Sequence, residues 1–276
     1  MKFGLFTYNF NEHADANLLL NFGIEAEKAG WDGVFLADHL HYKNTIKLIS
    51  PWIILSGIAT RTETIKLGTW VTAVPRRLPW QLAQDLATLD HLSNGRVILG
   101  AGLGAPPEDY SDYGTEYDLK QLAKRFDESL DIINGLWGHE NFSYEGDVFK
   151  INNVNLFPKP VQQPRIPILI AGRWPAKNPI KRGARWDGIM PISKDFPQQI
   201  PVDEIQNCID FFHTSRTSDS PGEVVLIYTK DSPRIEEFLP LCESMGVTWM
   251  LFATHPDMNS TQDPLEYIKQ GPPKTS

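Results

Sequence analysis

The sequence predicts an α/β protein folded as a closed (β/α)8 barrel. Two observations lead to this fold: short apolar segments alternate with helical patterns along the 276 residues, and those segments are apolar throughout. Strands that are apolar on both faces are typical of a parallel sheet covered on both sides. Eight such strands favour a closed barrel over an open doubly wound sheet, which usually has fewer strands and a topological switch. The predicted strands are residues 3–8, 33–37, 65–71, 96–102, 166–171, 188–192, 224–228 and 248–252.

The segments between these strands carry helix signals. The first ends before Gly30, which suits the left-handed position after a helix, and two others begin with Pro51 and Pro79 in the first turn. About sixty residues separate the fourth and fifth strands, roughly twice the usual interval, and residues 142–164 alternate with period two, which predicts a hairpin inserted there. With this insertion the chain is expected to form one barrel domain, residues 1–276. The predicted helices are residues 17–29, 51–60, 79–92, 121–137, 202–213, 233–245 and 264–269.

The composition excludes several classes of partner. With 34 acidic and 26 basic side chains, the formal charge is −8, so we expect neither nucleic acid nor a membrane surface as a partner. The polar residues Asn11 and Glu12 interrupt the N-terminal segment before it reaches the length of the apolar region of a signal peptide. No apolar run is long enough to span a bilayer. Cys208 and Cys242 lack metal-ligand or CxxC spacing. We therefore expect a cytoplasmic protein.

Candidate site residues follow the ends of the strands, because barrel enzymes build their active sites at the carboxyl ends of the strands. His39 follows the second strand and is a candidate acid, base or hydrogen-bond donor, with Asp38 able to orient it. The aspartate could equally pair with an arginine. Tyr8, Asn9 and His255 follow the first and last strands and are the expected substrate contacts.

The third, fourth and fifth strands end in residues that suit a flat, phosphorylated cofactor. Trp70 and Val71 would wall a ring, and Gly102, Leu103 and Gly104 would let the backbone approach it closely. The loop is not a dinucleotide fingerprint, because it continues into prolines instead of a helix. After the fifth strand, backbone N–H groups and a guanidinium would hold a phosphate. The residues at that end are Ala171, Gly172, Arg173 and Trp174.

A metal site is the chemical alternative. Histidines and carboxylates could supply ligands, but the His39-x-His41 pair follows the second strand, and no histidine ends the fifth or sixth strand. We therefore expect no metal. The side chains considered are His13, Asp38, His39, His41, Asp187 and His255.

Several stretches resemble the luciferase-like monooxygenases, which are flavin- or deazaflavin-dependent enzymes on a (β/α)8 barrel. The matching sequences are GWDGVFLADH, IKLGTWVTAVPRRLP, LATLDHLSNGRVILGAGLG, FSYEGDVFKINNVNLFPKPVQQPRIPILIAG and ARWDGIMP. They lie in the family's order between Gly30 and Pro191. The combination is specific, although no single stretch is.

The resemblance assigns roles position by position. His39 matches the histidine beside the reactive edge of the flavin, and the Trp70–Val71 bond matches a non-proline cis peptide against the ring. The loop from Gly102 to Gly104 matches a flavin contact, and residues 172–176 match the phosphate-binding turn. Arg125 matches an arginine that reaches the phosphate. Bacterial luciferase has a phosphate-binding arginine where this chain has Leu103, so Arg173 or Arg125 would carry that charge.

The resemblance implies an oxidoreductase that uses reduced FMN and O2 to oxygenate a small organic substrate, with a separate flavin reductase as a further expected partner. Hydride transfer with coenzyme F420 is the alternative, and a non-catalytic flavin-binding barrel is the second. The F420-dependent sugar-phosphate dehydrogenases have a glutamate in place of Ala105 and a tryptophan in place of Lys43, which weakens that particular reading. Family members commonly dimerise, and apolar residues on two helices predict a homodimer here. These residues are Trp52, Ile53, Ile54, Trp80 and Leu82.

Overall fold

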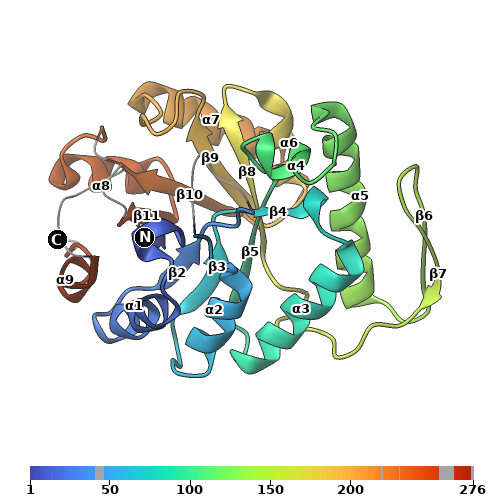
Figure 1. The fold of residues 1–276 in the computed structure, drawn as a ribbon. Coiled ribbons are helices and arrows are strands. Elements are labelled where there is room, and N and C mark those ends of the chain that lie inside the picture. Colours follow the sequence, from blue (N-terminus) through green and yellow to red (C-terminus); the bar gives the residue numbers. More distant parts are fainter. Residues whose placement is uncertain (41–46, 219, 230, 255–263, 275–276) are drawn as a thin grey trace.

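The computed structural model describes residues 1–40, 47–218, 220–229, 231–254 and 264–274. Parallel strands run through the centre of the molecule and helices surround them (Figure 1). The barrel strands are β1 (Lys2–Thr7), β2 (Gly33–Leu36), β3 (Lys66–Thr69), β5 (Val97–Gly102), β8 (Ile168–Trp174), β9 (Gly188–Ser193), β10 (Glu223–Tyr228) and β11 (Trp249–Ala253). Their spatial order is β3-β2-β1-β11-β10-β9-β8-β5, and pairing of β3 with β5 closes the ring. The two-residue strand β4 (Thr72–Ala73) adds to β5. The predicted (β/α)8 barrel is confirmed.

The first helix, α1, begins and ends at residues that suit a helix start and end. Asp15 accepts a hydrogen bond from the Leu18 N–H at the start of α1, and Gly30 follows that helix with φ +88°. Among the described residues, no helix is both long and apolar enough to cross a membrane. The helices are α1 (Ala16–Lys28), α2 (Pro51–Ala59), α3 (Pro79–Leu92), α4 (Glu108–Ser111), α5 (Leu119–Gly138), α6 (Lys177–Ala184), α7 (Val202–Ser215), α8 (Ile235–Ser244) and α9 (Pro264–Lys269). The turns η1 (Asn11–His13), η2 (Val74–Arg76) and α4 were not predicted, because three or four residues are too short for a helical period.

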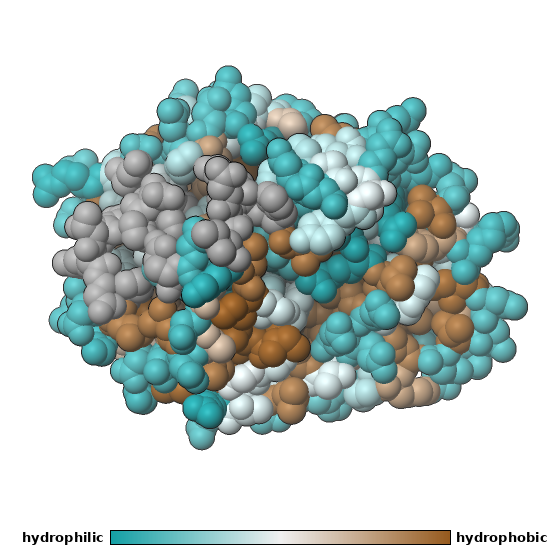
Figure 2. Space-filling view, viewed as in Figure 1, coloured by the Kyte–Doolittle hydropathy of each residue, from teal (hydrophilic) through white to brown (hydrophobic). Residues whose placement is uncertain are grey.

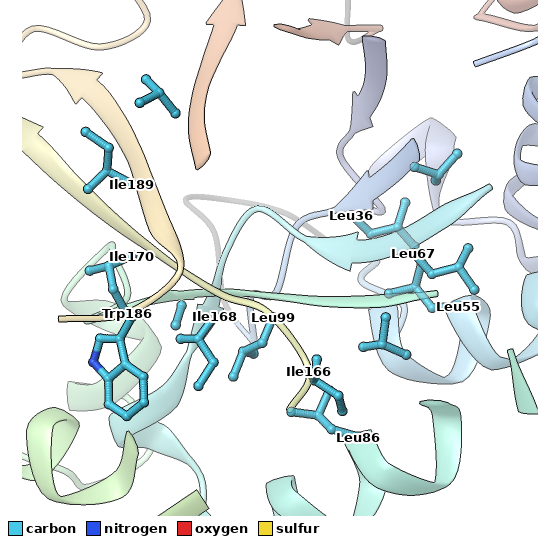
Figure 3. Packing of buried hydrophobic residues seen from close by; sticks show 14 of the residues in the cluster. Leu36, Leu55, Leu67, Leu86, Leu99, Ile166, Ile168, Ile170, Trp186 and Ile189 are labelled. Atoms are coloured by element: carbon cyan, nitrogen blue, oxygen red, sulfur yellow. The ribbon is translucent and has the colours of Figure 1, made fainter. Parts of the chain in front are cut away.

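Two apolar layers explain why the strands read as continuously apolar. Side chains alternate along each strand, so one set fills the inside of the barrel and the other packs under the helices. On β8, Leu169 faces inward, whereas Ile168 and Ile170 face the helices. Figure 3 shows the outer layer, where Leu99 and Ile168 from neighbouring strands lie close to one another.

A hairpin of β6 (Phe142–Glu145) and β7 (Lys150–Val154) is inserted between β5 and β8, as predicted, and extends from one side of the barrel (Figure 1). The buried Glu128 carboxylate on α5 anchors it. This carboxylate accepts hydrogen bonds of 2.9–3.1 Å from the N–H groups of Asp147, Val148 and Phe149 in the hairpin turn. The turn is therefore fixed by a side chain of the barrel and not by the hairpin alone.

Replacing Glu128 with glutamine is expected to destabilise the fold by about 1–3 kcal/mol, because an amide offers one acceptor oxygen to three N–H donors. Hydrogen exchange of the Asp147, Val148 and Phe149 amides should accelerate. The matched control is Glu145→Gln, since Glu145 pairs with Lys150 at an exposed position, where such pairs contribute about 0–1 kcal/mol. Equal effects of the two substitutions would contradict the anchoring role.

The apolar residues expected at a dimer interface are mostly used inside the chain. Trp52, Ile54 and Leu82 are buried, which leaves Ile53 at 71% and Trp80 at 39% exposure. On the face shown in Figure 2, apolar side chains gather in the lower half, where Figure 1 places α1, α2 and α3. The homodimer stays a prediction, with a smaller apolar surface than the sequence suggested.

Candidate active site

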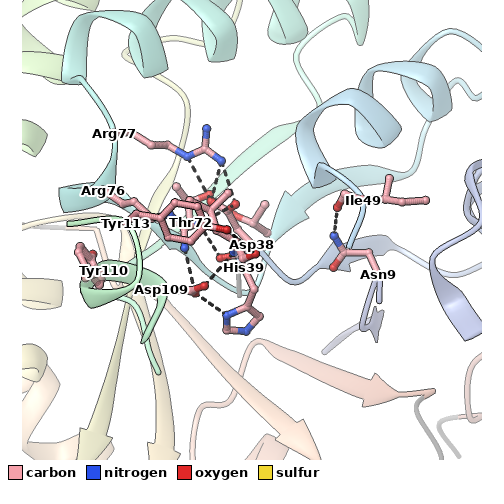
Figure 4. Close-up of polar contacts among 12 residues, drawn as sticks. Asn9, Asp38, His39, Ile49, Thr72, Arg76, Arg77, Asp109, Tyr110 and Tyr113 are labelled. Carbon is pink, nitrogen blue, oxygen red and sulfur yellow. Dashed lines mark hydrogen bonds and ion pairs between the residues drawn. The ribbon is translucent and has the colours of Figure 1, made fainter. Parts of the chain in front are cut away.

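The second strand places His39 at the carboxyl end of the barrel, where its ring is held by Asp109. The Nδ1 atom of His39 lies 2.9 Å from Oδ2 of Asp109, which is brought there by the short helix α4 (Figure 4). The other carboxylate oxygen accepts the Leu40 N–H at 2.9 Å. Because an ionised carboxylate only accepts hydrogen bonds, we assign Nδ1 as the donor in this pair.

The prediction that Asp38 orients His39 is wrong. The Asp38 carboxylate is buried and accepts hydrogen bonds from Nη2 of Arg76 at 3.0 Å and from Nη2 of Arg77 at 2.8 and 2.9 Å. Arg76 also donates to Asp109 at 2.9 Å, so it links the two aspartates (Figure 4). Asp38 is thus the partner of two arginines, which was the other reading open from the sequence.

An aromatic and apolar floor lies beside this network. The Trp70–Val71 peptide is cis, as the family resemblance implied. The Trp70 ring contacts Phe6 inside the barrel at a centroid distance of 4.7 Å and Phe196, in the loop after β9, at 5.5 Å. Trp70 and Val71 are half-buried and pack on the inner apolar cluster together with Ala171. A flat ring would find a fitting surface here.

The glycine loop after β5 is held close to the floor. A Cβ atom added to Gly102 would lie 2.7 Å from the Val71 side chain, and Gly104 has φ +87°. The hydroxyl of Tyr110 donates to the Leu103 carbonyl, and that of Tyr117 donates to the Gly104 carbonyl at 3.3 Å. The tight approach therefore requires glycine at both positions, and two tyrosines fix the loop between them.

Burial raises the pKa of both phenols. For Tyr117 the Arg173 guanidinium opposes the rise, and for Tyr110 the Arg76 guanidinium does so. Since each phenol ordinarily titrates near pH 10, both remain protonated donors at neutral pH. The loop contacts are therefore kept throughout the physiological range.

Alternation along β8 separates the four predicted cofactor residues into two pairs. Ala171 packs on the inner cluster, and the exposed Arg173 donates to the Lys194 carbonyl at 2.9 Å. Gly172 faces the helices, because an added Cβ would meet Pro179 of α6. Trp174 is buried against α7, where its Nε1 donates to Glu204. The Trp174 side chain therefore lies in the outer layer, and the predicted cofactor contact of this turn stays a prediction.

Two further predicted site residues, Arg125 and Asn9, form hydrogen bonds within the protein. Arg125 donates from Nε to the Pro75 carbonyl at 2.6 Å, and its guanidinium lies over the Phe149 ring of the hairpin. The side chain therefore packs between the barrel and the hairpin. Its phosphate contact stays a prediction. Asn9 is buried and donates to the Ile49 carbonyl, and its substrate contact stays a prediction. His255 lies outside the described residues.

Tyr8 lies at the end of β1, close to the aromatic floor. Its ring is 5.1 Å from Phe6 and 4.6 Å from Phe10, centroid to centroid. Only 8% of its surface is exposed. Its role as a substrate contact stays a prediction.

Sequence reasoning missed Asp109, Arg76 and Phe196. Asp109 is 70 residues from His39 in the chain, so no local pattern connects them. An acid in a short helix directly after a glycine-rich strand end was the available signal, because both segments reach the carboxyl face of a barrel.

The described residues considered for a metal contact other groups of the protein. His13 Nδ1 lies 3.3 Å from the Thr7 hydroxyl, and Asp187 accepts hydrogen bonds from Arg165 at 2.9 and 3.2 Å. Within the described part of the chain, no three histidine, cysteine or acidic side chains gather as a metal ion requires. His41 lies outside that part.

The fold is a (β/α)8 barrel with polar and aromatic side chains at the carboxyl ends of its strands, and comparison with known proteins identifies its family. The family model described as luciferase-like monooxygenase matches residues 1–207. The chain belongs to this family.

Relatives by sequence include F420-dependent enzymes. An F420-dependent glucose-6-phosphate dehydrogenase of Microbacterium testaceum is 35% identical over 176 residues, which cover 60% of this chain and 50% of that protein. The chain thus spans about half the length of that relative. An uncharacterised protein of Mycobacterium bovis is 30% identical over 82% of this chain and 76% of its own length.

Solved structures share the fold. An F420-dependent secondary alcohol dehydrogenase in complex with an F420–acetone adduct has a TM-score of 0.79 at 17% identity and covers 97% of this chain and 96% of its own. The monooxygenase RslO1 from Streptomyces bottropensis has a TM-score of 0.70 at 22% identity, with 83% and 71% covered. At these identities the likeness extends to the fold alone. The family model and the first of these relatives carry the names of oxidoreductases.

Proposed function

We propose that the protein is an F420-dependent oxidoreductase that transfers a hydride between the cofactor and a small organic substrate. The observation that carries the proposal is the His39–Asp109 pair beside the half-buried Trp70 and Val71. The names of the sequence relatives favour F420 over reduced FMN. Oxygenation with reduced FMN, served by a flavin reductase, is the competing reaction.

The residues present fit such a cofactor. At Gly102 and Gly104 a Cβ atom would collide with Val71 and Ala73, so glycine lets the loop backbone pack closely there, and Trp70, Val71 and Ala171 offer an apolar wall for a ring. Arg173, at the end of β8, suits a phosphate. F420, when bound, accepts or donates a hydride, whereas the protein binds, orients and excludes water.

The protein also has to move the proton that accompanies a hydride. An alcohol that is oxidised loses a proton from its hydroxyl group as well as a hydride from carbon. His39 is the proposed acceptor, through Nε2, because Asp109 holds the proton on Nδ1. Arg76 neutralises Asp109 and keeps its carboxylate in place.

Titration with oxidised F420, followed by its fluorescence, tests the cofactor proposal. We expect saturable binding that Arg173→Ala weakens roughly tenfold, since one charge-assisted hydrogen bond at an exposed position is lost. Arg165→Ala is the control, because Arg165 pairs with Asp187 before the start of β8. Absence of F420 binding to the unaltered protein contradicts the proposal.

A further inference from the structure

We propose that the substrate is a small, uncharged and largely apolar alcohol or ketone. The inference rests on the proposed function and names the substrate class of the same site. It comes from the side chains that form the upper surface of the inner barrel core.

Beside the His39–Asp109 pair, that surface carries an apolar cluster. The inner cluster contains buried Phe6, Tyr8 and Phe10, and the half-buried side chains packed on it are Leu48, Trp70, Val71, Ala171 and Phe196. Trp70, Val71 and Ala171 are the proposed wall for the cofactor ring. Leu48, bridged to Phe10, and Phe196 then remain as contacts for a substrate.

Several of the described hydroxyl groups at the strand ends bond to the protein itself, whereas the buried Thr229 hydroxyl after β10 has no hydrogen-bond partner among the described residues. Thr69 and Thr72 share a hydrogen bond of 2.8 Å, Ser193 accepts the Asp195 N–H at 3.1 Å, and Thr254 donates to the Phe6 carbonyl at 3.4 Å. All four are buried. A polyhydroxylated substrate such as a sugar would lose its bonds to water without gaining equivalent ones from these groups.

The charged groups also favour an uncharged substrate. Arg76 and Arg77 are held by Asp38 and Asp109, and among the described strand ends Arg173 and Lys194 lie together at β8 and β9. This one cationic position is the place proposed for the phosphate of the cofactor. A substrate with its own phosphate would require a second position.

Calorimetric titration of cyclohexanone and of glucose 6-phosphate into the protein, with and without F420, tests the inference. We expect binding of cyclohexanone, weakened roughly five- to thirtyfold by Phe196→Ala, because the ring contributes apolar contact area. Phe157→Ala is the matched control, since Phe157 also precedes a proline and is 59% exposed, but follows the hairpin. Turnover with F420 should be seen with cyclohexanol.

Binding or turnover of glucose 6-phosphate at least as favourable as that of the ketone or alcohol would overturn the inference. An unchanged affinity for cyclohexanone in Phe196→Ala would overturn it too. Cyclohexanone and glucose 6-phosphate are also compared by calorimetry without F420. Failure of F420 to bind therefore contradicts the cofactor proposal and not the proposed substrate class.

Discussion

Replacing His39 with alanine is expected to lower kcat by about 10²- to 10⁴-fold, the usual contribution of a positioned acid or base. The reason is that Nε2 of His39 is the proposed proton acceptor and Asp109 holds the other ring nitrogen at 2.9 Å. The dissociation constant for F420 should change less than kcat, because the ring is not proposed to hold the phosphate. Steady-state kinetics and fluorescence titration measure the two effects separately.

Two further variants sharpen this prediction. Asp109→Asn should lower kcat in the same direction while preserving the shape of the side chain, because an amide presents the ring with a donor as well as an acceptor. His91→Ala is the control, since His91 contacts the Lys159 carbonyl at the far end of α3. If His39→Ala retained most of the activity, the proton-transfer role would be contradicted.

Replacing Asp38 with asparagine is expected to destabilise the fold by about 3–5 kcal/mol, the usual effect of removing one member of a buried ion pair. Asp38 is 2% exposed at its side chain and Arg76 is 8% exposed, so the variant removes a buried carboxylate that pairs with both Arg76 and Arg77 and leaves Arg76 with Asp109 alone. Urea unfolding monitored by tryptophan fluorescence measures the change. Asp131→Asn is the control, because Asp131 and its partner Arg185 are 37% and 55% exposed, where such pairs contribute about 0–1 kcal/mol.

This prediction separates two neighbouring residues that look alike in the sequence. His39→Ala should reduce turnover with little effect on stability, and Asp38→Asn should reduce stability first. If the Asp38→Asn protein were stable and its kcat fell as far as that of His39→Ala, the structural role of Asp38 would be contradicted and a catalytic role supported.

The barrel could be predicted from the sequence because its signals are local. Each strand is a short apolar run, and Gly30, Pro51 and Pro79 mark helix ends in the positions where their backbone preferences place them. The hairpin also followed from alternation. The short helix α4, which carries Asp109, has no periodic signal and could not be predicted in this way.

The sequence predicts those site residues that directly follow a strand, because the position of a strand end can be read from the apolar pattern. His39, Trp70, Val71 and the glycine loop do meet at the carboxyl end, as their positions require. The partner of His39 depends on how α4 packs against β2, and the direction of Trp174 depends on where β8 ends. Since β8 continues to Trp174, side-chain alternation turns that residue away from the barrel interior.

Competing titrations with oxidised F420 and with FMN, under the same conditions, test the choice of cofactor most directly. Both can be followed by fluorescence, and the protein used is the full chain. We predict that F420 binds at least about tenfold more tightly than FMN, a difference of about 1.4 kcal/mol in binding free energy. Tighter binding of FMN, together with substrate-dependent oxygen consumption when FMN is supplied in reduced form, would contradict F420-dependent hydride transfer.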